Sequence, residues 1–254
     1  MTQPIFTSTV KKRLRDYGFF GRIAVKKLLL KSVNPRKRLK FAKEHRNWTM
    51  EQWRSVTWSD ESKFKLFGTK RRQFGRRKEG ERFKSQCIAP TVKFCGGSVM
   101  VWGSSSHSGV GELVKIDGIM RKEHYHQILQ QSAIPSGIGL IGYGFAFQHD
   151  NDHKHTSVLC KNYLRSKEEE GVLLVMEWPP QSPDMNPIEL LWEEFDRQLR
   201  LIYPTSGKSM FHCLKMVWDN IKAETLHKLV ERMPRICKTI IKAKGGHIDE
   251  KNLT

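Results

Sequence analysis

The pattern of apolar and polar positions predicts strands through the middle of the chain and helices at both ends. Short apolar or alternating runs predict two strands within 53–68, separated by a turn near Glu61 and Ser62, and further strands at 97–103, 112–116, 144–148 and 172–176. Helical spacing predicts helices at 8–15, 36–46, 123–131, 155–170 and from Pro187 onward, with Pro234 dividing the last 45 residues. Strands interleaved with helices, followed by a helical C-terminal region, predict an α/β fold.

The composition excludes several classes of protein. Apolar residues make up 38% of the chain and charged residues 28%, which is ordinary for a folded domain. No apolar run approaches the length of a membrane span, and the start of the sequence lacks the apolar stretch of a signal peptide. The five cysteines form no C-x-x-C pair, which argues against a disulfide framework or a zinc knuckle. We therefore expect one folded domain, with or without an arm, and no membrane partner.

The positive charge is concentrated in two stretches. The net charge is +19, of which residues 1–50 carry +12 and residues 63–84 carry +8. Such clustering favours a polyanionic partner, because lysine and arginine release counterions when they neutralise phosphates. A solvated surface or a nuclear import signal, for which the run from Arg36 to Arg38 is suited, is the alternative. The candidate DNA-binding residues are Lys11, Lys12, Arg13, Arg15, Arg36, Lys37, Arg38, Lys40, Arg71 and Arg72.

Three carboxylates stand where strands end or a helix begins. Asp60 and Asp150 each follow a strand-like run, and Glu189 lies in the first turn of a helix. Carboxylates in such positions can meet at one edge of a sheet, and three oxygen donors suit Mg²⁺ or Mn²⁺. Two such ions about 4 Å apart stabilise the attacking and leaving oxygens of phosphoryl transfer. Together with the basic stretches, this predicts metal-assisted cleavage or joining of DNA.

Each carboxylate also has a structural interpretation. Asp60 could belong to a turn, and Asp150 could form an Asx turn. Glu189 could complete a capping box with Asn186, with Pro187 at the first helical position. The residues alone leave both interpretations open.

Three longer motifs around these residues resemble those of the Tc/mariner DNA transposases. They are TWSDESKF around Asp60, FQHDNDHKHTS around Asp150 and EWPPQSPDMNPIELLW around Glu189. The resemblance runs from about residue 9 onward. It implies a ribonuclease H-like core, a mixed sheet flanked by helices, in which Asp60, Asp150 and Glu189 are the catalytic and metal-binding triad. It also implies cut-and-paste transposition that uses two Mg²⁺ or Mn²⁺ ions. The resemblance places this activity in the nucleus and assigns it to a homodimer assembled on transposon ends and target DNA.

The resemblance divides the chain in two and exposes departures from the family. Residues 1–50 are expected to be a basic arm, a remnant of the second helix-turn-helix and a linker, and residues 51–254 the catalytic domain. Because most of the helix-turn-helix region is expected to be missing, recognition of element ends should be weak; a transposase-derived DNA-binding protein without transposition activity is the alternative function. The 38 residues between Asp150 and Glu189 exceed the commonest family spacing, and His149 and His153 replace the usual Gln and Pro.

Overall fold

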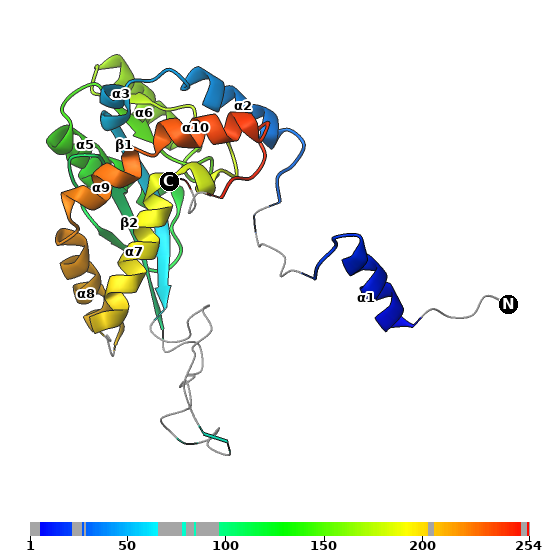
Figure 1. Cartoon of the computed structure of the whole chain (residues 1–254). Helices are drawn as coiled ribbons and strands as arrows, with labels where there is room; N and C mark the ends of the chain where they lie inside the picture. Colours follow the sequence, from blue (N-terminus) through cyan, green and yellow to red (C-terminus); the bar gives the residue numbers. More distant parts are fainter. Residues whose placement is uncertain are drawn as a thin grey trace.

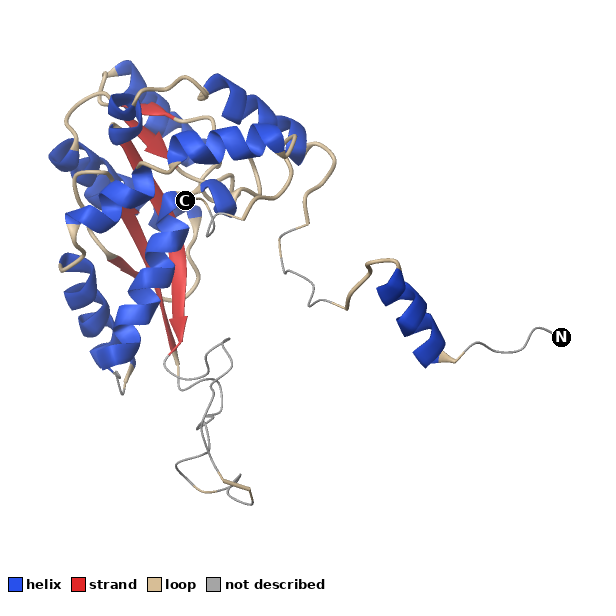
Figure 2. Cartoon of the chain, in the orientation of Figure 1, coloured by secondary structure: helices blue, strands red, loops and turns tan. Residues whose placement is uncertain are grey.

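The computed structural model describes residues 6–21, 27, 29–65, 78, 79, 84, 97–202, 206–249 and 253. At its centre is a mixed five-stranded sheet in the order β3-β2-β1-β4-β5, with helices on both faces (Figures 1 and 2). The strands are β1 (Val56–Lys65), β2 (Ser98–Ser105), β3 (Val114–Ile116), β4 (Phe145–Gln148) and β5 (Leu173–Val175). The α/β fold predicted from the sequence is confirmed, as are four of the predicted strand positions.

The strand pairing differs from the prediction at β1. Residues 56–65 form one continuous strand, without the turn expected near Glu61 and Ser62. The strand pairs antiparallel with β2 over the whole register from Trp58–Ser105 to Lys65–Ser98. This long-range ladder supplies the backbone partners of the polar residues, so the chain has no need to turn there.

Two apolar cores lie on opposite faces of the sheet. Because side chains alternate along a strand, Val56, Trp58 and Phe64 of β1 all face one core. That core also contains the apolar stripe of α7 (Pro187–Ile202). The second core contains Phe145 and Phe147 of β4 together with residues of the helices that cover the other face. The two faces of the sheet are therefore covered by different groups of helices.

The remaining helices follow the predicted order with shifted ends. The segment predicted at 123–131 continues through a π-helical turn, and the one predicted at 155–170 begins later, at Val158, capped by Ser157. Pro234 lies in the first turn of α10, as expected of a residue that divides two helices. Their bounds are α3 (Met50–Arg54), α4 (Lys122–Ile128), the π-helix Leu129–Ala133, α5 (Ile134–Leu140), α6 (Val158–Glu169), the 3₁₀ helix Pro183–Met185, α8 (Gly207–Asp219), α9 (Ala223–Val230) and α10 (Met233–Lys242).

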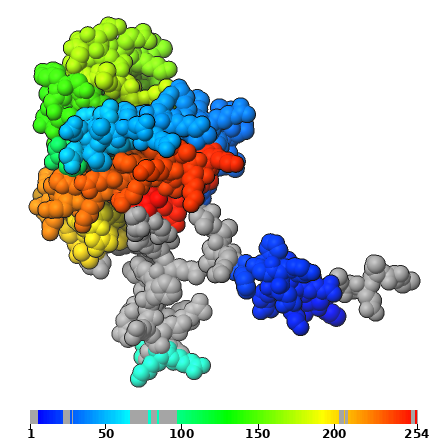
Figure 3. All heavy atoms as spheres, turned by 45° about the horizontal axis from the view of Figure 1, so that its top comes forward, coloured from blue at the N-terminus to red at the C-terminus, as the bar shows by residue number. Residues whose placement is uncertain are grey.

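The two basic helices near the N-terminus have different surroundings. The first, α1 (Thr7–Asp16), buries no residue and ends before Gly18, which has a positive φ of 81°. The second, α2 (Asn34–Glu44), lies beside α10 and contributes Phe41 and Ala42 to a core (Figure 3). No helix in the described ranges is long and apolar enough to cross a membrane.

Candidate active site

The middle of β1, the end of β4 and the start of α7 are joined by a buried network of hydrogen bonds. The hydroxyl of Ser59 donates to the carbonyl of Gln148 at 2.8 Å, and the amide N–H of Ser59 donates to the side chain of Gln148 at 3.1 Å. The side chain of Asn186 donates to the carbonyl of Ser59 at 3.3 Å and approaches Gln148 Oε1 at 3.4 Å. Asn186 also accepts from the backbone N–H of Ile188 at 3.3 Å, so the same residue caps α7.

This network joins the three segments that carry the predicted acids. The parallel pairing of β1 with β4 reaches Trp58 opposite Gln148, and Asp60 and Asp150 each follow two residues later. Glu189 lies in the first turn of α7, three residues after Asn186. Asp60 differs from its predicted position at a strand end, because β1 continues beside β2, but it does lie beyond the end of the β1–β4 pairing.

Asp60 lies on the face of β1 that α7 covers. Its Oδ2 accepts a hydrogen bond from Trp192 Nε1 at 3.0 Å. Gly103 pairs with Asp60 across the sheet, and a Cβ there would come within 2.8 Å of the Trp192 ring. The indole of Trp192 can therefore occupy its position beside Asp60 because residue 103 has no side chain. Burial raises the pKa of Asp60 well above its usual value, and the nearby charges of Glu189 and Glu61 raise it further.

Asp150 has the opposite electrostatic environment. Burial by itself would raise the pKa of Asp150, but its 2.5 Å contact with His155 Nδ1 outweighs that effect and lowers the pKa. The backbone N–H of Asp152 also donates to Asp150, at 2.9 Å, which completes the predicted Asx turn. Half of the Asp150 side chain remains exposed, whereas His155 is only 3% exposed.

His155 joins Asp150 to a fourth acid, Glu61. Its other ring nitrogen, Nε2, lies 3.0 Å from Glu61 Oε1, and its ring lies against that of Tyr125, with centroids 3.8 Å apart. Burial disfavours the charged imidazole, but the bonds to Asp150 and Glu61 outweigh burial and raise the pKa of His155 to about 9. His155 is therefore an imidazolium shared by two carboxylates at neutral pH.

Sequence reasoning missed Glu61, and it did not link His155, at the start of a predicted helix, to either acid. The signal that could have found Glu61 is strand alternation, because consecutive residues of β1 face opposite sides of the sheet. Asp60 thus faces Trp192, and Glu61 faces His155. Within the described ranges, no group of three or more His, Cys, Asp or Glu side chains is close enough together to hold a metal ion.

The two histidines that differ from the usual family residues, His149 and His153, lie in different surroundings. His149 lies against Phe147, and its Nδ1 is 2.9 Å from the carbonyl oxygen of Asp150. Burial lowers the pKa of His149 to about 4, and the charge of His155 contributes in the same direction. His153 is exposed and pairs with Asp152 at 3.0 Å. The two rings therefore do not form a joint site.

The predicted DNA contacts divide into three groups. Lys11, Lys12, Arg13 and Arg15 are exposed on α1, and Arg36, Lys37 and Lys40 are exposed on α2. Arg71 and Arg72 lie outside the described residues. Arg38 contradicts the prediction: it is fully buried and makes a two-pronged ion pair with Asp184, so its guanidinium cannot reach a phosphate.

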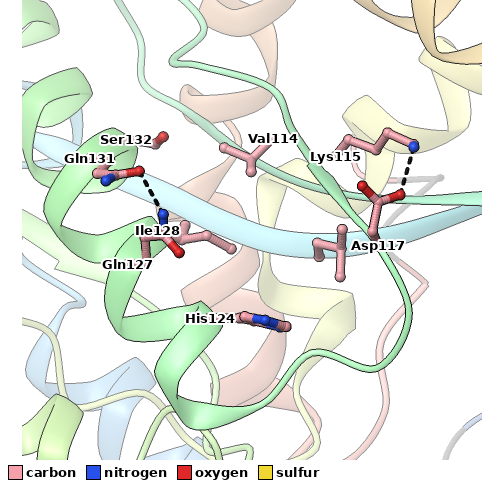
Figure 4. A pocket seen from close by; sticks show the side chains of 9 residues that line it. Val114, Lys115, Asp117, His124, Gln127, Ile128, Gln131 and Ser132 are labelled. Carbon is pink, nitrogen blue, oxygen red and sulfur yellow. Dashed lines mark hydrogen bonds and ion pairs between the residues drawn. The ribbon is translucent and has the colours of Figure 1, made fainter.

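A pocket of about 260 Å³ lies apart from these acids, between β3 and the helical segment that begins with α4 (Figure 4). Lys115 pairs with Asp117 at its mouth, and Gln127 donates to Gln131 along one wall. None of the predicted catalytic residues lines it, and we assign no function to it.

Comparison with known proteins identifies the relatives of the chain. A family described as transposase, of helix-turn-helix type, matches residues 3–47, and the DDE superfamily endonuclease family matches residues 55–210. The Tc1 transposase of Caenorhabditis elegans is 40% identical over 237 residues, which cover 93% of this chain and 85% of the relative. All three motif-bearing segments, those around Asp60, Asp150 and Glu189, fall within the matched endonuclease range.

Solved structures of Mos1 transposase share the fold. The Mos1 paired-end complex with left transposon end superposes with a TM-score of 0.74 at 18% identity, over 95% of this chain and 71% of that one. The mariner Mos1 paired end complex with Mg gives a TM-score of 0.69 at 18% identity, over 95% of this chain and 72% of that one. The sheet and its helices therefore form a ribonuclease H-like core.

Proposed function

Because the chain belongs to the Tc1/mariner family of DDE transposases, we propose that Asp60, Asp150 and Glu189 form the site at which it cleaves transposon DNA and joins it to a target. The observation that carries this assignment is the network of Ser59, Gln148 and Asn186, which joins β1, the end of β4 and the start of α7, the segments that carry the three acids. That arrangement requires three segments far apart in sequence to meet at one point.

The chemistry of the acids fits a divalent cation. Asp60 is buried near the negative charges of Glu189 and Glu61, an arrangement that favours an added positive charge. Asp150 is held as a carboxylate by His155, and its contacts with His155 and the Asp152 N–H both use Oδ1. Hard oxygen donors of this kind suit Mg²⁺ or Mn²⁺, and we propose two ions.

Each of these residues would then have a distinct role. Asp60, Asp150 and Glu189 would hold the ions, which supply stabilisation of the charge that develops on the attacking and leaving oxygens. Trp192 orients the carboxylate of Asp60 through its N–H, and His155 keeps Asp150 ionised and fixes its direction. Because the contacts of Asp150 with His155 and the Asp152 N–H both use Oδ1, its Oδ2 would be the atom with which Asp150 holds an ion.

The proposed partners are transposon ends and target DNA, bound by a homodimer in the nucleus. Phosphate contacts, for which no bracing by neighbouring helices is needed, are supplied by the exposed candidate residues of α1 and α2: Lys11, Lys12, Arg13, Arg15, Arg36, Lys37 and Lys40. The solved Mos1 structure is a paired-end complex with transposon DNA, which supports a dimer that holds two ends. Sedimentation of the chain with and without duplex DNA tests this assembly, which requires a dimer on DNA.

The decisive experiment is nicking of a supercoiled plasmid with Mg²⁺ or Mn²⁺. We expect metal-dependent nicking that Asp60→Asn, Asp150→Asn and Glu189→Gln each abolish, with DNA binding retained by all three. Retained binding with no nicking by the unsubstituted chain would instead favour a transposase-derived DNA-binding protein. Full activity of Glu189→Gln in a nicking-competent chain would show that Glu189 only caps α7.

A further inference from the structure

The segment that leads into α7 is held from outside by α2. Arg38, on the inner face of α2, forms two parallel hydrogen bonds with Asp184, from Nη1 to Oδ1 at 2.6 Å and from Nη2 to Oδ2 at 2.7 Å. The side chain of Arg38 is 0% exposed and that of Asp184 6%. Asp184 lies in the 3₁₀ helix directly before Asn186 and α7. Two charges have thus been removed from water at the entrance to the helix that bears Glu189.

The remaining donors of Arg38 bind a third segment. Nε donates to the carbonyl of Gly245 at 2.9 Å, and Nη2 donates to that of Gly246 at 3.1 Å. The backbone N–H of Ile248 donates to Asp184 Oδ2 at 3.3 Å, so the third segment bonds to both partners of the ion pair. Three parts of the chain therefore meet at one buried guanidinium; we call this meeting point the Arg38 junction.

The approach of the third segment to α2 depends on glycine. Gly245 has a φ of 84°, and a Cβ there would stand 2.0 Å from the carbonyl oxygen of Pro35. A side chain is excluded by both the backbone conformation and the space. The turn can present its carbonyls to Arg38 only because this residue is glycine.

Further contacts tie α2 to the same segment. Asn34 donates to the side chain of Gln181, whose φ of 53° is unusual for a residue with a side chain. Phe41 packs edge-on against Trp178, with ring centroids 5.0 Å apart. Lys40 pairs with Glu177 at the surface, at 3.3 Å. The inner face of α2 therefore contacts the segment at several points between residues 177 and 184.

The other end of the segment is fixed to the sheet. Asn186, two residues after Asp184, is bonded to the carbonyl of Ser59 on β1 and approaches Gln148 at the end of β4. The first turn of α7, with Glu189, follows immediately. The start of α7 is thus held between the Arg38 junction on one side and the strands that lead to Asp60 and Asp150 on the other.

We propose that Arg38 and Asp184 are positioning residues, which set the location of Glu189 relative to Asp60 for metal binding. This inference rests on the proposed function. Arginine is required because its rigid planar fork satisfies a carboxylate and two carbonyls at once, whereas the lysine ammonium is a single point of charge. Neither residue touches DNA or the ions; they act through the backbone between Asp184 and Glu189.

The test compares variants of the full chain in three measurements: Mn²⁺ binding followed by the electron paramagnetic resonance of free Mn²⁺, plasmid nicking over a range of Mg²⁺ concentrations, and duplex DNA binding. The main variant, Arg38→Gln with Asp184→Asn, removes both charges together, so that no unpaired buried charge prevents folding. Arg38→Lys is the conservative variant. Lys43→Gln removes an exposed charge from the same helix, and Val172→Ala weakens the core on the other face of the sheet.

We expect the double variant to need at least about tenfold more Mn²⁺ for half-saturation, and more Mg²⁺ for half-maximal nicking, as is typical when the residues that orient metal ligands are lost. DNA affinity should stay unchanged, and Arg38→Lys should fall between the double variant and the unsubstituted chain. Lys43→Gln and Val172→Ala should keep the metal midpoints of the unsubstituted chain.

Three results would overturn the inference. If the unsubstituted chain binds Mn²⁺ and nicks DNA, and the folded double variant has the same midpoints, then the Arg38 junction does not position Glu189. An equal midpoint shift in Val172→Ala would assign the effect to general stability. If Glu189→Gln leaves Mn²⁺ binding and nicking intact, the proposed function is wrong, and the inference that rests on it is wrong as well.

Discussion

Asp60 and Asp150 each lie two residues beyond the end of the β1–β4 pairing, yet their environments push their pKa values in opposite directions. Asp60 is buried beside other acids, and its pKa is raised; Asp150 is partly exposed beside an imidazolium, and its pKa is lowered. The difference arises from β1 itself, whose successive residues face Trp192 on one side and His155 on the other. A carboxylate site can therefore combine an acid without a neighbouring positive charge among the described residues, Asp60, with an acid that is paired with an imidazolium, Asp150.

Neutralising either aspartate should have the largest effect on activity, and the two substitutions should differ in their effect on stability. Asp60→Asn and Asp150→Asn should each reduce metal-dependent nicking by about 1000-fold or more, since each removes several kcal/mol of charge stabilisation. Their effects on stability should differ in sign. Asp60→Asn should leave unfolding free energy unchanged or raise it at pH 8, because it removes a destabilised charge.

Asp150→Asn should instead lower the free energy of unfolding by about 1.5–3 kcal/mol, because a charge-assisted hydrogen bond to His155 is lost. Urea unfolding of both variants without divalent ions measures the two effects. Stability changes of the same sign would mean that the two aspartates do not differ as their contacts indicate.

Removing His155 should produce the next largest effect, and one that depends on pH. The folded-state pKa of about 9 exceeds the ordinary value of 6.5, so the stabilisation by His155 is fully present below pH 6.5 and is lost as pH rises through 9. His155→Asn should therefore cost about 2–3 kcal/mol at pH 6, and the difference from the unsubstituted chain should shrink by pH 9.5.

Urea unfolding at pH 6, 7.5 and 9.5 without divalent ions follows that difference. The matched control is His153→Asn, at an exposed position two residues away. A gap between His155→Asn and the unsubstituted chain that stays constant with pH would show that His155 contributes by packing against Tyr125 rather than by its charge.

A smaller change is expected at Trp192. Trp192→Phe removes the N–H that donates to Asp60, a hydrogen bond worth about 1 kcal/mol, and so should raise the pKa of Asp60 further. Carboxyl ¹³C titration by NMR measures this directly. Trp178→Phe, which changes an indole that is also buried but does not contact Asp60, serves as the control. An unchanged titration of Asp60 in Trp192→Phe would contradict the hydrogen bond.

The smallest effect should come from His149→Gln, which restores the residue usual in the family. His149 is neutral at pH 7, because its pKa is about 4, so it adds no charge to the site. We expect a change in nicking rate below about threefold, equivalent to less than about 0.7 kcal/mol. A larger change in the single-turnover rate would show that this substitution has altered the site.

Local patterns predicted most elements of the fold because those elements have strong local signals. The strand at 144–148, for example, is a short apolar run between a glycine and polar residues, and α7 has an apolar stripe that is continuous from Ile188 to Leu199. The turn expected at Glu61 and Ser62 was wrong for the opposite reason. Two polar residues look like a turn locally, and only the pairing with β2, some 40 residues away, makes them part of a strand.

The site was predictable only in part. The long motifs identified the segments that carry Asp60, Asp150 and Glu189, but nothing in them shows that His155 bridges to Glu61, 94 positions earlier in the chain. Arg38 is the clearest example of a contact that the sequence could not predict, since its place in a basic run predicts a phosphate contact. Its actual partner, Asp184, is 146 positions away, and a charge pattern carries no information about pairing over that separation.

The Arg38 junction also bears on how the protein is made. Arg38 and Gly245 are 207 positions apart, so the hydrogen bonds between them cannot form on the ribosome until nearly all of the described chain has been synthesised. Contacts with such long loops are the slowest to close. A nascent chain would carry its basic helices, free to meet nucleic acid, well before the turn at residues 245–248 locks the entrance to α7. The start of α7 would thus gain this attachment only after the turn at residues 245–248 has been synthesised.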